Sequence, residues 1–213
     1  MPESSPSAAT NRRPIAARDN ALVHQAATLL MRSGLSPNAI SVASIGFAAA
    51  GAYALLQLPT PWNTWLCAAA AVLRLLCNLL DGLVAVEGGR QTPAGALYNE
   101  VPDRIADSLF IVALGMAAGQ PWLGWLGALL AALTAYVRTL GGALGLAQDF
   151  RGPMAKPHRM WTLVVACLIA PVQLQLLPQA NTLLIAAALI AAGSAITCCT
   201  RLRAIAAQLE QRA

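Results

Sequence analysis

The chain has 213 residues, of which 57% are hydrophobic and only 11% are charged, and its mean hydropathy is +0.59. Because soluble domains usually carry about 25% charged residues, this composition excludes an ordinary water-soluble protein and predicts an integral membrane protein, most simply of one domain. The formal net charge is +5, and the placement of the basic residues carries information on topology.

The first 20 residues are rich in Pro, Ser, Ala and Arg and contain no apolar run. We therefore expect residues 1–20 to form a disordered cytoplasmic tail and not a signal peptide. Residues 21–33 place apolar side chains on one helical face but are too short and too polar to span a bilayer. This pattern is typical of an amphipathic helix that lies on the membrane interface. Ser36 and Pro37 are then expected to cap and begin the next helix.

Six apolar segments follow, each of roughly the length that crosses a bilayer. They lie near 38–58, 63–86, 95–118, 121–146, 160–177 and 181–200. The predicted fold is all-α: an integral membrane bundle of six transmembrane helices with an N-terminal juxtamembrane amphipathic helix. We expect the membrane domain to cover residues 34–205 and residues 206–213 to form a cytoplasmic tail.

Basic residues are distributed unevenly among the connections between these segments. The connections near 58–63, 119–121 and 177–181 carry no charge, whereas both termini and the other two connections carry nearly every Lys and Arg. The positive-inside rule therefore predicts that both termini are cytoplasmic. The expected location is the inner or plasma membrane, with several passes through the bilayer.

Polar residues recur at spacings of three and four in two of the apolar segments. The members are Asn78, Asp81 and Ala85 in the second segment, and Gly95, Asn99, Asp103 and Asp107 at the start of the third. Residues at these spacings share one face of a helix. Ionisable groups at membrane depth are costly and usually mark a site, and the topology predicts that this site is cytoplasmic.

Three uses of such a cluster are open from spacing alone. Its oxygen atoms suit a divalent cation such as Mg²⁺ or Mn²⁺, its carboxylates suit a proton or ion pathway, and its polar groups suit a network that holds helices together. The small residues Gly82, Ala85 and Gly95 favour the first use. They leave room for a bulky ligand such as a metal-bound phosphate ester near the backbone.

With Gly82 directly after Asp81, and eight residues between Val86 and Gly95, the spacing resembles the signature of the CDP-alcohol phosphotransferases. Residues 36–41, Ser-Pro-Asn-Ala-Ile-Ser, are similar to that family's usual opening of the first helix. The resemblance covers most of the chain. It implies an enzyme of phospholipid biosynthesis that moves a substituted phosphate, expected to be the phosphatidyl group of CDP-diacylglycerol, to an alcohol with release of CMP.

The resemblance also implies roles for individual residues. Asn78, Asp81, Asn99 and Asp103 would form the metal shell for one or two Mg²⁺ or Mn²⁺ ions. Asp103 would also be the general base that deprotonates the acceptor alcohol. Gly82, Ala85 and Gly95 would line the pocket for the cytidine diphosphate.

Three positions depart from the family pattern. Asn78, Val86 and Asn99 stand where the family has Asp, Arg and Asp, so two negative charges are lost and metal binding is expected to weaken. Glu100 and Asp107 are candidates for compensating carboxylates. The candidate phosphate or acceptor contacts are Arg90, Arg104, Arg138, Lys156 and Arg159. Arg74, one turn before Asn78, is compatible with facing the cluster and with extending toward the interface.

These departures keep two alternatives open beside the enzyme. One is a catalytically weak or inactive relative that binds a nucleotide-lipid or a partner enzyme, and the other is a small membrane transporter. The expected partners of the enzyme are a CDP-linked lipid donor, a small alcohol acceptor, the lipid bilayer and a second copy of the chain in a homodimer. No nucleic acid partner is expected.

Overall fold

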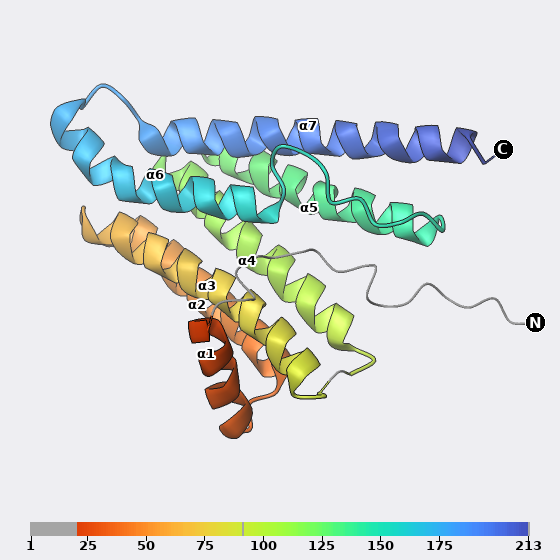
Figure 1. Ribbon diagram of the computed structural model, residues 1–213. Coiled ribbons are helices and arrows are strands. Elements are labelled where there is room, and N and C mark those ends of the chain that lie inside the picture. Colours follow the sequence, from red (N-terminus) through yellow and green to blue (C-terminus); the bar gives the residue numbers. More distant parts are fainter. Residues whose placement is uncertain (1–20, 91, 213) are drawn as a thin grey trace, which may run out of the picture.

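The computed structural model describes residues 21–90 and 92–212, and in these residues the chain forms seven helices and no strand (Figure 1). The predicted disordered tail, residues 1–20, lies outside the described residues. The helices are α1 (Ala21–Arg32), α2 (Pro37–Gln57), α3 (Trp62–Glu87), α4 (Gly95–Ala117), α5 (Pro121–Ala143), α6 (Lys156–Leu176) and α7 (Thr182–Glu210). The predicted all-α class is confirmed.

The helices pack as two groups that meet at α4. Helices α3 and α4 both pack against α2, and α5 and α6 pack along α7 (Figure 1). Contacts of α4 with α5 and of α3 with α6 join the two groups. The polar residues of α3 and α4 therefore lie beside the first turns of α6, which no local sequence pattern predicts.

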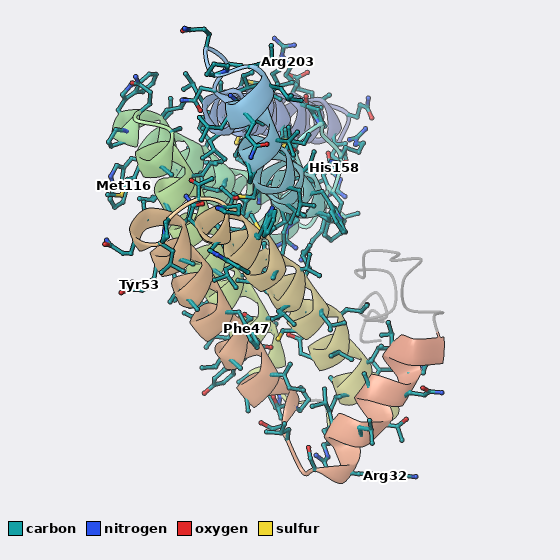
Figure 2. All side chains as sticks on the ribbon, turned by 90° about the vertical axis from the view of Figure 1, so that its left-hand side faces the viewer. Arg32, Phe47, Tyr53, Met116, His158 and Arg203 are labelled. Atoms are coloured by element: carbon teal, nitrogen blue, oxygen red, sulfur yellow. The ribbon has the colours of Figure 1, made fainter. Side chains whose placement is uncertain are left out.

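Five of these helices are long and apolar enough to cross a membrane: α2, α3, α5, α6 and α7. Helix α4 has 23 residues, but its first half carries Glu100, Asp103, Arg104 and Asp107. Large apolar side chains such as Tyr53 on α2 point outward from the bundle, as lipid-facing residues do (Figure 2). The protein is therefore a multi-pass membrane protein, and the count of six spans stays a prediction for α4.

Helix α1 packs against the C-terminal half of α3. Ala27 is fully buried and lies in one apolar cluster with Leu79, Leu83 and Val84 of α3. On its other side Leu29 is 65% exposed. The helix therefore buries one face against α3 and leaves the other face exposed on the surface of the bundle. Such two-sided character agrees with the predicted amphipathic helix.

Capping residues explain where the helices begin. The Ser36 side chain accepts a hydrogen bond from the backbone N–H of Ala39 at 3.2 Å, and Pro37 occupies the first turn of α2, as predicted. Helix α6, in contrast, begins at Lys156 and not near residue 160. The expected start was wrong because Pro157 fits the first turn of a helix, where a backbone N–H has no partner to lose. Lys156 and Arg159 are thus helical residues.

Small residues set the distance between α4 and α5. A Cβ atom added to Gly115 would lie 2.4 Å from the backbone of Gly124, so both positions require glycine for the two helices to touch. Close packing through small residues is the usual way in which helices associate in lipid. It fixes α4, and with it the polar face of α4, against the second helix group.

Candidate active site

Helix α3 holds Asp81 against α2. The Asp81 carboxylate is 5% exposed, and its Oδ2 accepts a hydrogen bond from the Ser41 hydroxyl at 2.5 Å. Within the described residues no Lys, Arg or His forms an ion pair with it. Asp81 is therefore a buried carboxylate without an ion-pair partner in the described part of the chain.

The amide residues of the motif, Asn78 and Asn99, take no part in the ion pairs of the described chain. Asn78 is half-buried, and its Nδ2 has no hydrogen-bond partner in the described part of the chain. Asn99 is exposed on the second turn of α4. Gly82, Ala85 and Gly95 are half-buried. The nearest atom to a Cβ added at Gly95 is the Thr92 Oγ1, at 3.6 Å, so this edge of the site is open.

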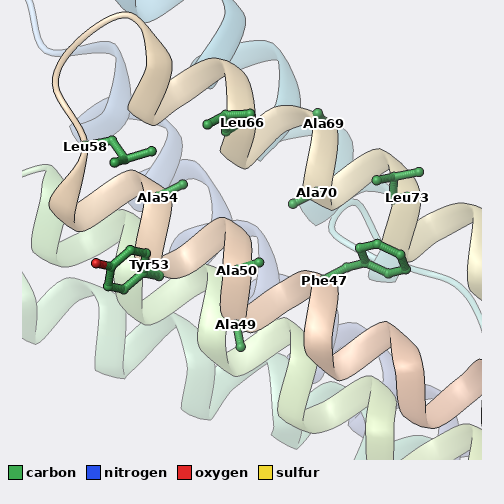
Figure 3. A pocket seen from close by; sticks show the side chains of 10 residues that line it. All are labelled: Phe47, Ala49, Ala50, Tyr53, Ala54, Leu58, Leu66, Ala69, Ala70 and Leu73. Atoms are coloured by element: carbon green, nitrogen blue, oxygen red, sulfur yellow. The ribbon is translucent and has the colours of Figure 1, made fainter.

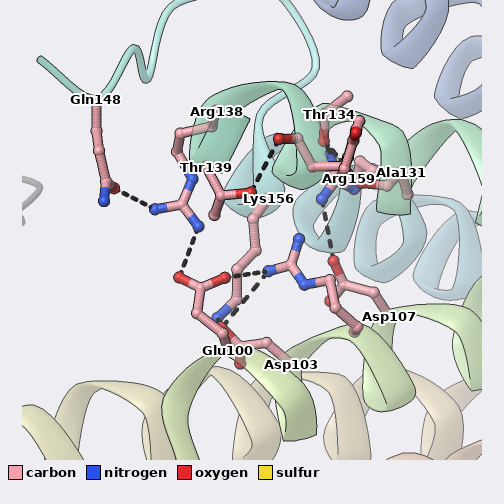
Figure 4. Close-up of polar contacts among 12 residues, drawn as sticks. Glu100, Asp103, Asp107, Ala131, Thr134, Arg138, Thr139, Gln148, Lys156 and Arg159 are labelled. Carbon is pink, nitrogen blue, oxygen red and sulfur yellow. Dashed lines mark hydrogen bonds and ion pairs between the residues drawn. The ribbon is translucent and has the colours of Figure 1, made fainter. Parts of the chain in front are cut away.

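Asp103, the last position of the motif, is held in a different way. Its carboxylate is buried, and its Oδ1 accepts a hydrogen bond from Arg74 Nη2 at 3.1 Å. Its Oδ2 contacts the ammonium of Lys156 (Figure 4). Arg104 Nη2 lies 3.8 Å from the same oxygen. Both carboxylate oxygens of Asp103 are therefore occupied by cationic side chains from α3 and α6.

Asp107, one turn further along α4, continues this network. Its Oδ1 accepts a hydrogen bond from Arg74 at 2.7 Å. Its Oδ2 accepts one from Arg159 at 3.0 Å (Figure 4). The side chains of Arg74 and Arg159 are 0% and 1% exposed. Arg74 therefore faces the cluster and does not extend toward the interface. We name the set Arg74, Asp103, Asp107, Lys156 and Arg159 the α3–α4–α6 ion-pair network.

Glu100 and Arg138 form an outer layer next to the network. Arg138 donates to Glu100 Oε1 at 2.6 Å and to Gln148 Oε1 at 2.7 Å (Figure 4), and its guanidinium lies over the Phe150 ring. Glu100 is thus engaged by Arg138. Arg90 lies apart from both layers. It is exposed and donates to the backbone carbonyl of Leu35 at 3.2 Å.

The loop between α5 and α6 is anchored on α7 and positions the network from that side. A Cβ atom added to Gly152 would meet Thr197 at 2.4 Å, and the backbone N–H of Met154 donates to Thr197 Oγ1. Arg159 in turn donates to the carbonyl of Met154 at 2.8 Å. Hydrogen bonding to Arg151 lowers the pKa of Asp149 in this loop, so both side chains stay charged.

The motif spacing does not predict the contacts of two further buried polar residues, Ser41 and Arg201. Ser41 orients Asp81 from another helix, and its only sequence signal is its place at the end of the Ser36–Ser41 segment. Arg201 is buried on α7, where it donates to the backbone carbonyls of Arg151 and Thr134 at 2.8 and 2.6 Å. Its signal is that it is the first charged residue of an otherwise apolar helix. The spacing within one helix predicts neither contact.

An apolar groove runs along the seam of α2 and α3. It extends from Phe47 and Leu73, the residue before Arg74, to Leu58 at the end of α2 (Figure 3). Alanines form its floor: Ala49, Ala50, Ala54, Ala69 and Ala70. Its lining is of the kind that accommodates a hydrocarbon chain.

Comparison with known proteins decides the family. A sequence model of the family described as CDP-alcohol phosphatidyltransferase matches residues 34–199. The chain belongs to this family. The archaetidylinositol phosphate synthase of Aeropyrum pernix is 32% identical over 151 residues, which are 70% of this chain and 75% of the relative.

Solved structures agree with this assignment. The phosphatidylinositol phosphate synthase of Mycobacterium tuberculosis with CDP-DAG bound has a TM-score of 0.73 at 24% identity, over 87% of this chain and 94% of that one. The same enzyme in complex with manganese and citrate has a TM-score of 0.72 at 25% identity, over 86% and 88%. The predicted family, membrane fold and enzyme class are confirmed, which favours the enzyme over a transporter.

The site offers oxygen donors for a divalent cation but few carboxylates that are not already in an ion pair. Asp81, Asn78 and Asn99 all offer oxygen atoms, the ligands that hard dications prefer. In the described part of the chain, however, no three His, Cys, Asp or Glu side chains gather to hold a metal. Asp103, the other retained carboxylate, already contacts Arg74 and Lys156. A cation near Asp81 would rely on one carboxylate and on amide oxygens.

Proposed function

We propose that this protein transfers a substituted phosphate, the phosphatidyl group of CDP-diacylglycerol, to an alcohol and releases CMP. The observation that carries this proposal is the burial of Asp81 on α3 and Asp103 on α4, at 5% and 4% exposure, in two helices that both pack on α2. Both occupy their places in the spacing of the family motif. The CDP-DAG bound to the structurally similar Mycobacterium enzyme supports the choice of donor.

In this reaction the acceptor hydroxyl oxygen attacks the β-phosphorus of the donor. A new O–P bond forms, the bond from that phosphorus to the bridging oxygen breaks, and the electron pair leaves with CMP. Asp103 takes the hydroxyl proton. Because buried Arg74 fixes Oδ1, the proton is expected at Oδ2, which requires Lys156 to move aside. General-base assistance of this kind contributes roughly 10²–10⁴-fold.

The proposed cofactor is one Mg²⁺ or Mn²⁺ ion, held by Asp81 with the amide oxygens of Asn78 and Asn99. When bound, it polarises the diphosphate and balances charge on the leaving CMP. Ser41 keeps the Asp81 carboxylate oriented. Burial of the site among the helices excludes bulk water from Asp103.

The remaining surfaces suit the two substrates. Gly82, Ala85 and Gly95 are proposed to line the nucleotide pocket, and the α2–α3 groove to receive an acyl chain. Lys156 and Arg104 are the partly exposed cations around Asp103, at 23% and 26% exposure of their side chains. Their charge favours an acceptor that itself carries a phosphate.

The topology follows from the charge distribution. We propose that both termini and the active site are cytoplasmic, since the basic connections flank the polar ends of α3 and α4. A soluble acceptor and a lipid donor would then meet at this surface. A homodimer is proposed from the family resemblance and from the small-residue faces of the helices.

The proposal is tested by assaying purified protein for CMP release from CDP-diacylglycerol with Mg²⁺ or Mn²⁺. A panel of free and phosphorylated alcohols serves as acceptors, and mass spectrometry identifies the lipid product. We expect CMP release that needs an acceptor and stops on chelation with EDTA. The exposed Arg203→Ala variant is the control for Asp81→Ala and Asp103→Ala, which are expected to be inactive. Unchanged activity in both would contradict the assignment, and nucleotide binding without CMP release would indicate a non-catalytic relative.

A further inference from the structure

The α3–α4–α6 ion-pair network contains more cations than carboxylates. Asp103 and Asp107 contribute two negative charges, and Arg74, Lys156 and Arg159 contribute three positive charges. Two of these cations are almost completely buried. The positive charge of the network therefore exceeds its negative charge before any ligand binds.

Lys156 has a special place among the three cations. Arg74 and Arg159 are buried and joined to Asp107, whereas the Lys156 side chain is 23% exposed and contacts only Asp103 among the carboxylates. It approaches from α6 and contacts the Oδ2 oxygen directly. Arg74 contacts the other oxygen, and Arg104 Nη2 lies farther from Oδ2, at 3.8 Å.

The charge count matches the departures from the family motif. Asn78 and Asn99 remove two carboxylates from the metal shell that the resemblance implies. The Nδ2 of Asn78 and the Nε and Nη1 of Arg74, one turn earlier on α3, are buried donors without a partner in the described part of the chain. This part of α3 therefore carries the positive charge of Arg74 and a neutral amide, and it offers a metal ion less negative charge than an acidic pair would.

We propose that Lys156 is a built-in cation at Asp103 that stands in place of a second metal ion, so that the site takes one divalent cation per chain. The inference rests on the proposed function, because it concerns the same site. In this role Lys156 is a positioning residue: it neutralises and holds the Asp103 carboxylate in the substrate-free protein. The single divalent cation belongs to the Asp81 side, because no ion pair with Asp81 forms among residues 21–90 and 92–212.

The experiment counts bound Mn²⁺ in the full chain in detergent, without substrate, by the loss of the free Mn²⁺ signal in electron paramagnetic resonance. We expect one Mn²⁺ per wild-type chain. In Lys156→Met, which removes the ammonium but keeps the length of the side chain, we expect a second Mn²⁺ to bind at Asp103. Adding Asp103→Asn to this variant should return the count to one, and Lys156→Arg should keep it at one.

Arg203→Met is the matched control, because it removes one positive charge from an exposed position on α7 (Figure 2). Its count should remain one. A wild-type count of two or of zero overturns the inference even if Lys156→Met does not fold, and so does an unchanged count in folded Lys156→Met. An altered KM for the acceptor in that variant, with a count of one, would make Lys156 a substrate contact instead. Because no turnover is measured in the count, CMP release can succeed or fail independently.

Discussion

Asp81 and Asp103 occupy equivalent places in the motif, and both are buried, but their surroundings differ. Asp81 accepts a hydrogen bond from a neutral hydroxyl, and no cation of the described chain pairs with it. Asp103 and Asp107 belong to a network of three cationic side chains. The comparison shows that one motif can contain a buried carboxylate without an ion pair in the described chain and another whose two oxygens both contact cationic side chains.

The largest expected effect is the loss of CMP release on substitution of Asp103, the proposed general base of the ion-pair network. Asp103→Asn keeps the size of the side chain but removes the proton acceptor, so CMP release should fall by roughly 10²–10⁴-fold. The measurement is CMP release per folded protein at saturating donor and acceptor. Wild-type activity in this variant would show that Asp103 is not the base.

Stability should depend most on Asp107. The change Asp107→Asn leaves Arg74 and Arg159 buried with one carboxylate fewer, and loss of a buried partner costs about 3–5 kcal/mol. Thermal unfolding in detergent, followed by Trp fluorescence, should show a clearly lower midpoint than for Glu210→Gln, an exposed control. Equal midpoints in the two variants would mean that the network does not stabilise the fold.

A smaller effect is expected on the Asp81 side. Ser41→Ala removes the hydroxyl that orients Asp81, and we expect about a tenfold loss of CMP release, equivalent to about 1.4 kcal/mol. Ser44→Ala is the matched control, since the Ser44 hydroxyl donates to a backbone carbonyl at 2.6 Å and not to Asp81. Equal losses in the two variants would assign the effect to helix packing.

The smallest effect, on the free energy of unfolding, is expected for Arg90, which lies outside both the ion-pair network and the surroundings of Asp81. Arg90 is exposed, and its one side-chain hydrogen bond within residues 21–90 and 92–212 is to a backbone carbonyl, so Arg90→Ala should change the free energy of unfolding by less than about 0.5 kcal/mol. The same unfolding assay on Arg159→Ala should show a loss several times larger. Similar values for the two variants would contradict the distinction between surface and network arginines.

The sequence predicts the helices well, because apolar runs and caps are local signals. Five of the six apolar segments begin within one residue of the observed helices. The exception is the predicted segment 160–177. The corresponding helix, α6, begins four residues before the predicted start because Pro157 belongs to its first turn. This difference matters for function, since it places Lys156 and Arg159 on a helix beside α3 and α4.

The site is predicted only in part. Spacing identifies Asp81, Asp103 and Asp107, because residues three and four apart share a helical face. The pairing of Arg74 with Asp103, and of Lys156 with the same carboxylate, depends on contacts between helices far apart in the chain. Ser41 and Arg201 escape for the same reason. Their partners are set by tertiary packing, which no periodicity within a segment encodes.

The proposed role of Asp81 as the carboxylate that holds the divalent cation is tested most directly by one pair of measurements on Asp81→Asn. The variant should lose CMP release and Mn²⁺ binding while its thermal unfolding stays close to that of the wild-type protein, because no cation of the described chain depends on this carboxylate. Retained CMP release with Mn²⁺ binding would contradict the central claim. A collapse of stability comparable to that of Asp107→Asn would contradict it as well.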